Sequence, residues 1–370
     1  MKTKIFNFIK HEIVFIISAF MAIISMFFLH PNKSYIDYID FRVLALLLSL
    51  MLVIAGFQKI GTFVFIGNKL LSKTNSSKQI IFTTVLLCFF SSMFLTNDVA
   101  LITFVPFSIL ILSTANMHKF TIITIVLQTI AANLGSMLTP LGNPQNLYIY
   151  SIFNVPILTF LKIMLPYTAI SLLAILIFIS FLKKDKIKVN DIEFKKISTL
   201  KQLVYISLFS LCILSVLHKV DYILTLFIVI FSIFILDKKI LISIDYILLL
   251  TFVCFFVFIG NMSNLTYVKS FVENLIEKKE LVLSIILSQF ISNVPAAILL
   301  SKFTANYKQL LIGVNIGGLG TLIASLASLI SYKYYIKTEN SNPKKYLLVF
   351  SILNIVFIFI LLISYHIFNF

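Results

Sequence analysis

Charged residues and cysteines are scarce in this chain of 370 residues. Asp, Glu, Lys and Arg make up only 12% of it, against 60% hydrophobic residues, and the mean hydropathy is +1.05. The three cysteines, Cys88, Cys212 and Cys254, lie in separate apolar segments and form no CxxC pair. This spacing argues against a disulfide framework and against a zinc site. Tryptophan is absent, whereas phenylalanine occurs 38 times, a composition typical of surfaces that face lipid.

The sequence also lacks the short motifs that carry catalysis or nucleotide binding. It contains no phosphate-binding loop, no HExxH metal motif and no nucleophile motif. We therefore expect no ATP drive within this chain, no enzymatic activity and no cofactor. The formal charge of +16 does not indicate nucleic-acid binding, because the lysines fall in short stretches between apolar runs, as orientation signals do.

Long apolar runs dominate what is present. Several approach the roughly 20 residues that span a bilayer as a helix, and they do not alternate with the period of two that a transmembrane barrel requires. The sequence thus predicts an all-α, multi-pass protein of the cytoplasmic membrane, with residues 1–370 forming one membrane domain. The first apolar run has no small-residue cleavage site, so we interpret it as a helix and not as a removed signal peptide.

Two of the apolar stretches are interrupted at their centres by polar residues. The stretch 79–112 contains Thr96, Asn97 and Asp98, and the stretch 281–303 contains Ser292 and Asn293. A polar break at membrane depth is tolerated only where protein or a water-filled cavity surrounds it. These two breaks are therefore where we expect the functional site.

The rest of the chain is assigned from the same pattern. Loops are expected at 31–40 and 70–78, an amphipathic connection at 265–280, and Gly- and Asn-rich interruptions at 133–146 and 315–325. Continuous helices are expected at 12–29, 41–59, 120–133, 157–182, 203–217, 223–236, 246–259 and 347–363.

The lysines favour a particular topology. If the N-terminus is cytoplasmic and each broken stretch enters and leaves on one side, 21 of the 30 basic residues lie inside and 9 outside. Such a bias towards the cytoplasm is the usual one. The first stretch is then a re-entrant hairpin that opens inward, the second one opens outward, and the C-terminus lies outside.

The two halves of the chain also resemble each other. Asp40 and Asp245 each precede a helix that is followed by a polar link, a hairpin with an asparagine at its tip, and a Gly-rich break beginning at Asn133 or Asn315. The separation from the tip asparagine to the next asparagine is 36 residues in the first half and 22 in the second, so the second half needs shorter helices. The expected inverted repeats are 40–182 and 243–367, joined by a cytoplasmic loop at 183–201.

Chain breaks of this kind expose backbone groups. The N–H groups at the start of a helix attract anions and the carbonyls at its end attract cations. Proline and asparagine could merely kink buried helices, but four breaks in two symmetric pairs favour a transport site at mid-membrane. A channel lined by the broken helices, and a scaffold or receptor, are the competing classes.

Four segments, LTNDVALITFVP, NLGSMLTPLGNPQNL, ISNVPAAILL and NIGGLGTLIASLA, resemble the signature stretches of the ion transporter superfamily. This group contains citrate and dicarboxylate transporters, arsenite permeases and one class of sodium/proton antiporters. The resemblance covers nearly the whole chain. It implies two re-entrant hairpins and two broken helices, a homodimer, elevator-type movement, and a small anion transported with sodium or protons.

The resemblance also implies which residues bind the solute and the ions. A sodium site is expected near Asn97, Asp98 and Asn293. The full set of implied binding residues is Thr96, Asn97 and Asp98 at the first tip, Ser292 and Asn293 at the second, Asn133, Gly135, Thr139, Pro140, Gly142 and Asn143 in the first broken helix, and Asn315, Gly317, Gly318, Thr321 and Ser325 in the second.

The first tip departs from the carboxylate transporters at Asp98, where they usually have threonine, and the second tip has Val294 in place of threonine. The second broken helix has Leu322 and Ala324 where the first has Pro140 and Gly142. An intramembrane carboxylate is costly, by roughly 3 kcal/mol on insertion scales, and is a functional candidate by default. Asp98 could bind a cation, carry a proton or cap the following helix. We expect the first tip to dominate ion coupling.

Overall fold

The computed structural model describes residues 12–71, 74–185, 198–339 and 341–368, and all regular elements in these ranges are helices. Eight of the described helices are long and apolar enough to cross a membrane. These findings confirm an all-helical, multi-pass membrane protein. The eight are α4 (Phe41–Lys59), α6 (Ser77–Leu95), α7 (Asn97–Thr114), α8 with its preceding turn (His118–Ser136), α10 (Ile157–Ser180), α11 (Thr199–Val216), α14 (Tyr246–Asn264) and α20 (Pro343–Phe368).

Shorter helices complete the chain. They are α2 (Ile13–Phe28), α3 (Tyr35–Tyr38), α5 (Thr62–Leu71), α9 (Pro144–Ile152), α12 (Tyr222–Asp237), α13 (Ile240–Ser243), α15 (Thr266–Ile276), α16 (Glu280–Ile291), α17 (Asn293–Ser301), α18 (Tyr307–Gly317) and α19 (Leu326–Tyr335). The two arms beside the first break have 19 and 18 residues, and those beside the second have 12 and 9. The expectation of short helices in the second half is therefore confirmed.

Several local expectations need correction. The loop expected at 31–40 contains α3, which follows a turn in which the Ser34 amide donates to Asn32 Oδ1 at 2.9 Å. Helix α5 extends to Leu71, so the loop expected from residue 70 starts later. Residues 186–197, which form most of the expected 183–201 loop, lie outside the described residues, as do Lys2, Lys4, Lys10 and Lys73 of the topology count.

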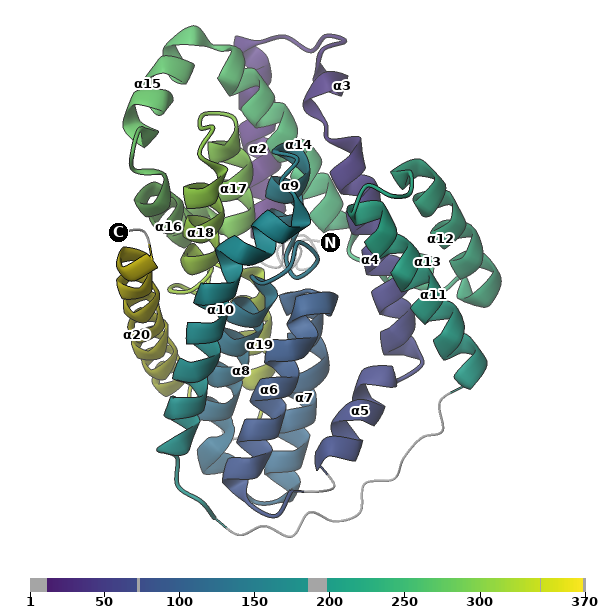
Figure 1. Ribbon diagram of the computed structural model, residues 1–370, viewed down its shortest axis with the longest axis vertical. Helices are drawn as coiled ribbons and strands as arrows, with labels where there is room; N and C mark the ends of the chain where they lie inside the picture. Colours follow the sequence, from purple (N-terminus) through teal and green to yellow (C-terminus); the bar gives the residue numbers. More distant parts are fainter. Residues whose placement is uncertain (1–11, 72–73, 186–197, 340, 369–370) are drawn as a thin grey trace, which may run out of the picture.

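The helices contact one another mainly within two groups. In the first group, α2 packs along α14, and α4 packs against α11 and α12. In the second group, α6, α7, α8 and α10 pack with one another and with α18, α19 and α20, while α16 and α17 pack against α18, and α17 also against α9. Figure 1 shows α11, α12 and α13 on the right of the view, with α6, α7, α8 and α10 at lower centre. Contacts between the groups run chiefly through α14 with α17, α4 with α9, and α5 with α6 and α7.

Each interrupted stretch forms a hairpin whose two ends lie close together. The start of α6 and the turn that follows α7 meet through Asp185: its main chain exchanges two 2.9 Å hydrogen bonds with Ser77, and its carboxylate lies 2.6 Å from Lys119 in that turn. In the second hairpin, Thr304 donates to Glu280 Oε1 at 3.2 Å. Figure 1 shows the first hairpin in the lower half of the molecule and the second in the upper half.

The same end-to-end geometry makes a testable prediction about topology. In a chain whose own three cysteines are replaced by alanine, Lys119→Cys marks the open end of the first hairpin and Lys302→Cys that of the second. We expect a membrane-impermeant maleimide to label Lys302→Cys in intact cells and Lys119→Cys only after the membrane is opened. Labelling of both from the same side would contradict hairpins that open to opposite faces.

Candidate functional site

The two tips have the same unusual backbone conformation. Thr96 has φ 73° and ψ 149°, and Ser292 has φ 75° and ψ 153°. Residues with a side chain rarely adopt this region, and each instance costs on the order of 1–3 kcal/mol unless its surroundings hold it in place. Strain of this kind gathers at functional sites. Its repetition at both predicted tips indicates that the two hairpins reverse in the same way.

A hydrogen bond to the broken helix of the same half holds each tip. The backbone N–H of Asn97 donates to the Gly142 carbonyl at 3.1 Å, and the backbone N–H of Asn293 donates to the Ala324 carbonyl at 3.0 Å. These two acceptors are the positions that the sequence comparison of the halves paired. Each bond satisfies one of the N–H groups that a helix start leaves without an intrahelical partner.

A threonine in each break makes a second matching contact. Thr139 Oγ1 donates to the Met93 carbonyl, and Thr321 Oγ1 donates to the Gln289 carbonyl at 3.0 Å. Both acceptors lie three residues before their tip, at the carbonyl end of the first arm. The predicted residues Thr139 and Thr321 are thus structural partners of the hairpins.

Close approach of backbones explains two of the predicted glycines. A Cβ added at Gly135 would lie 2.0 Å from the Phe89 carbonyl oxygen, and one at Gly317 would lie 2.6 Å from Ser288 Oγ. Both distances are too short for any side chain. Each broken helix therefore packs its glycine directly onto the first arm of its hairpin.

Buried amides join the two halves. Asn97 Nδ2 donates to Asn133 Oδ1 at 2.8 Å, and Ser325 Oγ donates to the same oxygen at 3.1 Å. Asn133 Nδ2 lies 3.4 Å from the Gly318 carbonyl and 3.4 Å from Ser328 Oγ. Asn97, Asn133 and Ser325 are at most 4% exposed. The structure thus brings together four of the predicted residues, from the first tip and both breaks.

A second link between the halves lies nearby. Asn315 Nδ2 donates to Asn146 Oδ1 at 2.7 Å, and both side chains are buried. Asn146 lies in the predicted break but was not among the predicted site residues. Asn133 and Asn315 were expected to open the two breaks, but they lie in the last turns of α8 and α18, so each break begins a few residues later. Both side chains reach across to the other half.

A cavity of about 310 Å³ lies between the first tip and the first helix group. Of the predicted residues, Thr96, Asp98 and Asn143 line it. Asp98 is half-buried, and its carboxylate has no hydrogen-bond or ion-pair partner among the described residues. The Asp98 amide instead donates a 2.9 Å hydrogen bond to Asn97 Oδ1. The carboxylate therefore does not cap α7. Of the three roles expected for Asp98, cation binding and proton transfer remain.

Sequence reasoning missed several polar residues of the cavity wall, among them Gln58, Asp245 and Lys333. Gln58 comes from α4, Asp245 precedes α14, and Lys333 comes from α19. Asp245 was noted only as a helix start, and indeed its side chain accepts from the Leu248 amide at 3.1 Å. These groups are far apart along the chain, so no local pattern could have placed them together. Asp98 and Asp245 face one cavity, where like charges repel.

Several predicted residues do not line this cavity. In the first half, the residues outside its wall are Asn97, Asn133, Gly135, Thr139, Pro140 and Gly142. In the second half, they are Ser292, Asn293, Asn315, Gly317, Gly318, Thr321 and Ser325. Four of them, Asn97, Asn133, Gly318 and Ser325, belong instead to the buried contacts described above. The second half contributes instead two other groups of residues. They are Leu326, Leu329, Ile330 and Lys333 on α19, and Ser243, Ile244, Asp245 and Leu248 at the start of α14 and just before it.

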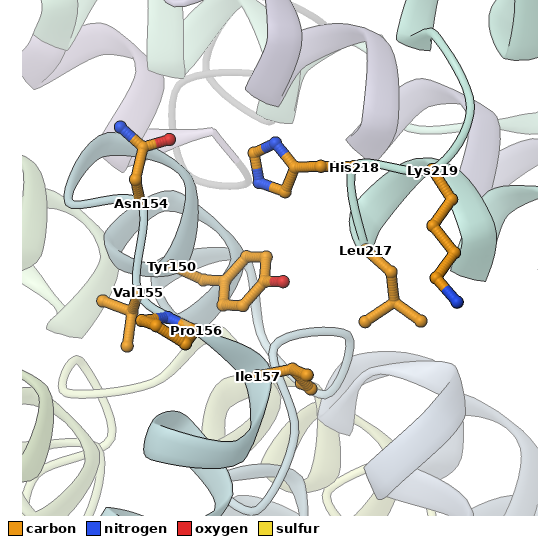
Figure 2. Close-up of a pocket in the computed structure, with 8 residues that line it drawn as sticks. All are labelled: Tyr150, Asn154, Val155, Pro156, Ile157, Leu217, His218 and Lys219. Carbon is orange, nitrogen blue, oxygen red and sulfur yellow. The ribbon is translucent and has the colours of Figure 1, made fainter.

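A separate cavity of about 420 Å³ lies between the α9–α10 turn and the α11–α12 turn, as Figure 2 shows. Its wall contains Tyr150, Asn154, His218 and Lys219 but none of the predicted site residues. Burial, and next the positive charge of Arg42, lower the pKa of the His218 imidazole. This cavity lies where residues 150–157 of the second helix group approach residues 217–219 of the first.

Comparison with known proteins decides the family. A model of the citrate transporter family (CitMHS) matches residues 5–313. The chain belongs to the citrate transporter family. It is thus a multi-pass membrane transporter, and the resemblance stated from the sequence is confirmed.

Two relatives match this chain over most of their length. It is 33% identical to the uncharacterized transporter MJ0456 of Methanocaldococcus jannaschii over 327 residues, which cover 87% of this chain and 88% of that one. It is 30% identical to the inner membrane protein YbiR of Escherichia coli K12 over 314 residues, or 84% of each chain. A third match, 25% identical over 151 residues, covers 40% of this chain and 18% of the mouse P protein.

The strained tips make a prediction about stability. Glycine removes the strain at Thr96 and Ser292, whereas alanine keeps it, so we expect each Gly variant to unfold at a higher temperature than the matching Ala variant. Ser207 is an exposed residue inside α11, where Ala should exceed Gly by about 1 kcal/mol. Thermal unfolding in detergent measures the order of the Gly and Ala melting temperatures at the tips and at Ser207. Ala variants more stable than Gly variants at both tips would contradict the strain.

Proposed function

We propose that this transporter moves a small anion, a di- or tricarboxylate or an inorganic oxyanion, across the cytoplasmic membrane by secondary active transport coupled to sodium ions or protons. The observation that carries the proposal is the Asp98 carboxylate, which has no protein partner among the described residues and lines a cavity beside the Asn97–Asn133–Ser325 amide cluster. Backbone N–H groups and amides suit an anion, and the carboxylate suits the ion that accompanies it.

The proposed architecture is an inverted repeat of 40–182 and 243–367. In it α6–α7 and α16–α17 are re-entrant hairpins, and α8–α9 and α18–α19 are broken membrane helices. Three observations support this: the equal tip dihedrals, the equivalent amide-to-carbonyl bonds at Gly142 and Ala324, and the hairpin ends at opposite ends of the molecule. Sites between such broken helices suit alternating access.

The separation into two helix groups supports an elevator-type movement. The second group contains both hairpins and both breaks, so it would carry the solute, while the first would stay fixed in the membrane. We place the N-terminus inside and the C-terminus outside, and we propose a homodimer that contacts lipid on its remaining surface. Contacts between the two groups, and the cavity of Figure 2 that lies between them, would then have to rearrange in each transport cycle.

Charge in the cavity supports coupling to a cation. Asp98 of the second helix group and Asp245, which precedes α14 of the first, both line it. An anion entering this cavity meets repulsion unless a sodium ion or a proton accompanies it. We place the sodium ion, if sodium is the coupling ion, near Asn97 and Asp98 and towards Asn293.

The same pair of carboxylates, Asp98 and Asp245, favours a second candidate function. A sodium/proton antiporter needs a carboxylate that binds either cation in turn, and Asp98 could serve in that way. An arsenite-type efflux permease remains within the same proposal, since it would use the same tips for a different solute. Saturation of flux by citrate, succinate, sulfate or arsenite separates the anion carriers from an antiporter.

Asp98→Asn tests the proposal in proteoliposomes with imposed sodium or proton gradients. We expect gradient-driven flux to fall by about tenfold or more, because the neutral amide no longer holds the coupling ion and the loss of a contact with a charged group costs roughly 1.5–3 kcal/mol. Asp37→Asn, which changes an exposed carboxylate outside the cavity, is the control and should keep full flux. Unchanged flux with unchanged ion dependence in Asp98→Asn would contradict the proposed role.

A further inference from the structure

Gln289, in the last turn of α16, points its amide nitrogen at three backbone carbonyls. Nε2 lies 3.1 Å from the Ile285 oxygen, 3.0 Å from the Gly317 oxygen and 2.9 Å from the Leu319 oxygen. Its Oε1 accepts from the Thr321 amide at 2.9 Å. The side chain therefore closes the second break from the hairpin side.

Three acceptors around one nitrogen exceed what an amide can satisfy. The NH₂ group has two protons, so at least one carbonyl shares a proton or lacks one. Gly317 ends α18 and Leu319 lies in the break that follows, so both carbonyls belong to the negative end of a helix dipole. Carbonyls that a broken helix exposes in this way are the groups with which transporters coordinate monovalent cations.

The carbonyls of Ile285, Gly317 and Leu319 form a carbonyl cage. We propose that the side-chain NH₂ group of Gln289 occupies this cage, which would otherwise bind a monovalent cation such as sodium. The second break of the native protein then needs no cation of its own. Given the proposed function, ion coupling is confined to the first tip, where Asp98 lies.

The first half differs at the equivalent place. The residue three positions before its tip is Met93, whose side chain carries no amide group. The carbonyls of that break instead receive Asn146 Nδ2, at 3.3 Å for Ser136, 3.5 Å for Met137 and 3.2 Å for Thr139. These contacts are longer than those of Gln289, so the first break is closed less tightly than the second.

A purely structural role for Gln289 is the competing explanation. Gly320 has φ +111°, and a Cβ there would lie 2.2 Å from Gln289 Oε1, so Gln289 also braces a turn that only glycine can make. Removal of the side chain destabilises the protein in both explanations. Only the carbonyl cage predicts that a free cation replaces the lost amide.

The experiment compares Gln289→Ala with Gln128→Ala. Gln128 is the matched control, because it is fully buried and its Nε2 lies 2.8 Å from Ser108 Oγ, 3.4 Å from the Phe104 carbonyl and 3.5 Å from the Thr84 carbonyl. Both changes are made in an Asp98→Asn chain, so that sodium at the first tip does not contribute. Melting temperatures are measured in choline, lithium, sodium and potassium chloride at constant ionic strength.

We expect both variants to melt below the parent in choline. Sodium, or another of the three alkali cations, should raise the melting temperature of Gln289→Ala by several degrees with saturation, because a ligand that binds only the folded state stabilises it. The Asp98→Asn parent and Gln128→Ala should show no cation preference. A Gln289→Ala variant that responds to none of the cations, or no more than the parent does, would overturn the proposal.

Gln289→Met provides a second variant, since it installs the residue of the first half. If neither variant can be recovered from membranes extracted in sodium while Gln128→Ala can, the proposal is also contradicted, because a cation should then have replaced the amide. These measurements use no transport. A failed flux experiment would therefore weaken the proposed function and leave this inference standing.

Discussion

A chain that turns back inside a membrane must satisfy the backbone groups that the turn exposes, and this constraint accounts for most of the polar contacts at the two tips. Each tip donates its first free N–H to a carbonyl of the opposing broken helix. Each break returns a threonine hydroxyl to the hairpin. Water cannot supply these partners at membrane depth, and an unmet group costs several kcal/mol there. Hairpin and broken helix therefore depend on each other in both halves.

The two halves meet this constraint with unequal side chains. The second break is closed by Gln289 from within the hairpin, and its tip does not line the cavity near Asp98. The first tip faces that cavity and presents a carboxylate with no partner among the described residues. If the proposed function holds, the second half serves mainly as a rigid partner, and the solute and the coupling ion bind at the first tip.

Much of the architecture could be predicted from the sequence because it depends on local composition. Apolar runs indicated the membrane helices, polar residues inside such runs indicated both tips, and the repeat indicated the pairing of Gly142 with Ala324. The spacing of 22 against 36 residues correctly indicated short helices in the second half. Helix α5 was missed because a ten-residue apolar segment after glycine resembles a loop as much as a helix.

The polar wall of the cavity could not be predicted in the same way. Gln58, Asp245 and Lys333 come from three places far apart in the chain, and their meeting depends on how the two helix groups pack. Gln289 stands in the sequence as a polar residue inside the apolar stretch 281–303, but its three carbonyl partners depend on the path of the second break. Long-range packing, not local propensity, decides such contacts.

Solute protection of single cysteines tests the location of the site most directly. In a chain without its own cysteines, Thr96→Cys at the first tip and Leu326→Cys on α19 line the cavity from different halves, and Lys219→Cys lines the cavity of Figure 2. With whichever of citrate, succinate, sulfate or arsenite is transported, we expect Thr96→Cys and Leu326→Cys to be protected from a maleimide at the same solute concentration, and Lys219→Cys to stay reactive. Protection of Lys219→Cys alone, with both cavity cysteines unaffected, would contradict a solute site at the first tip.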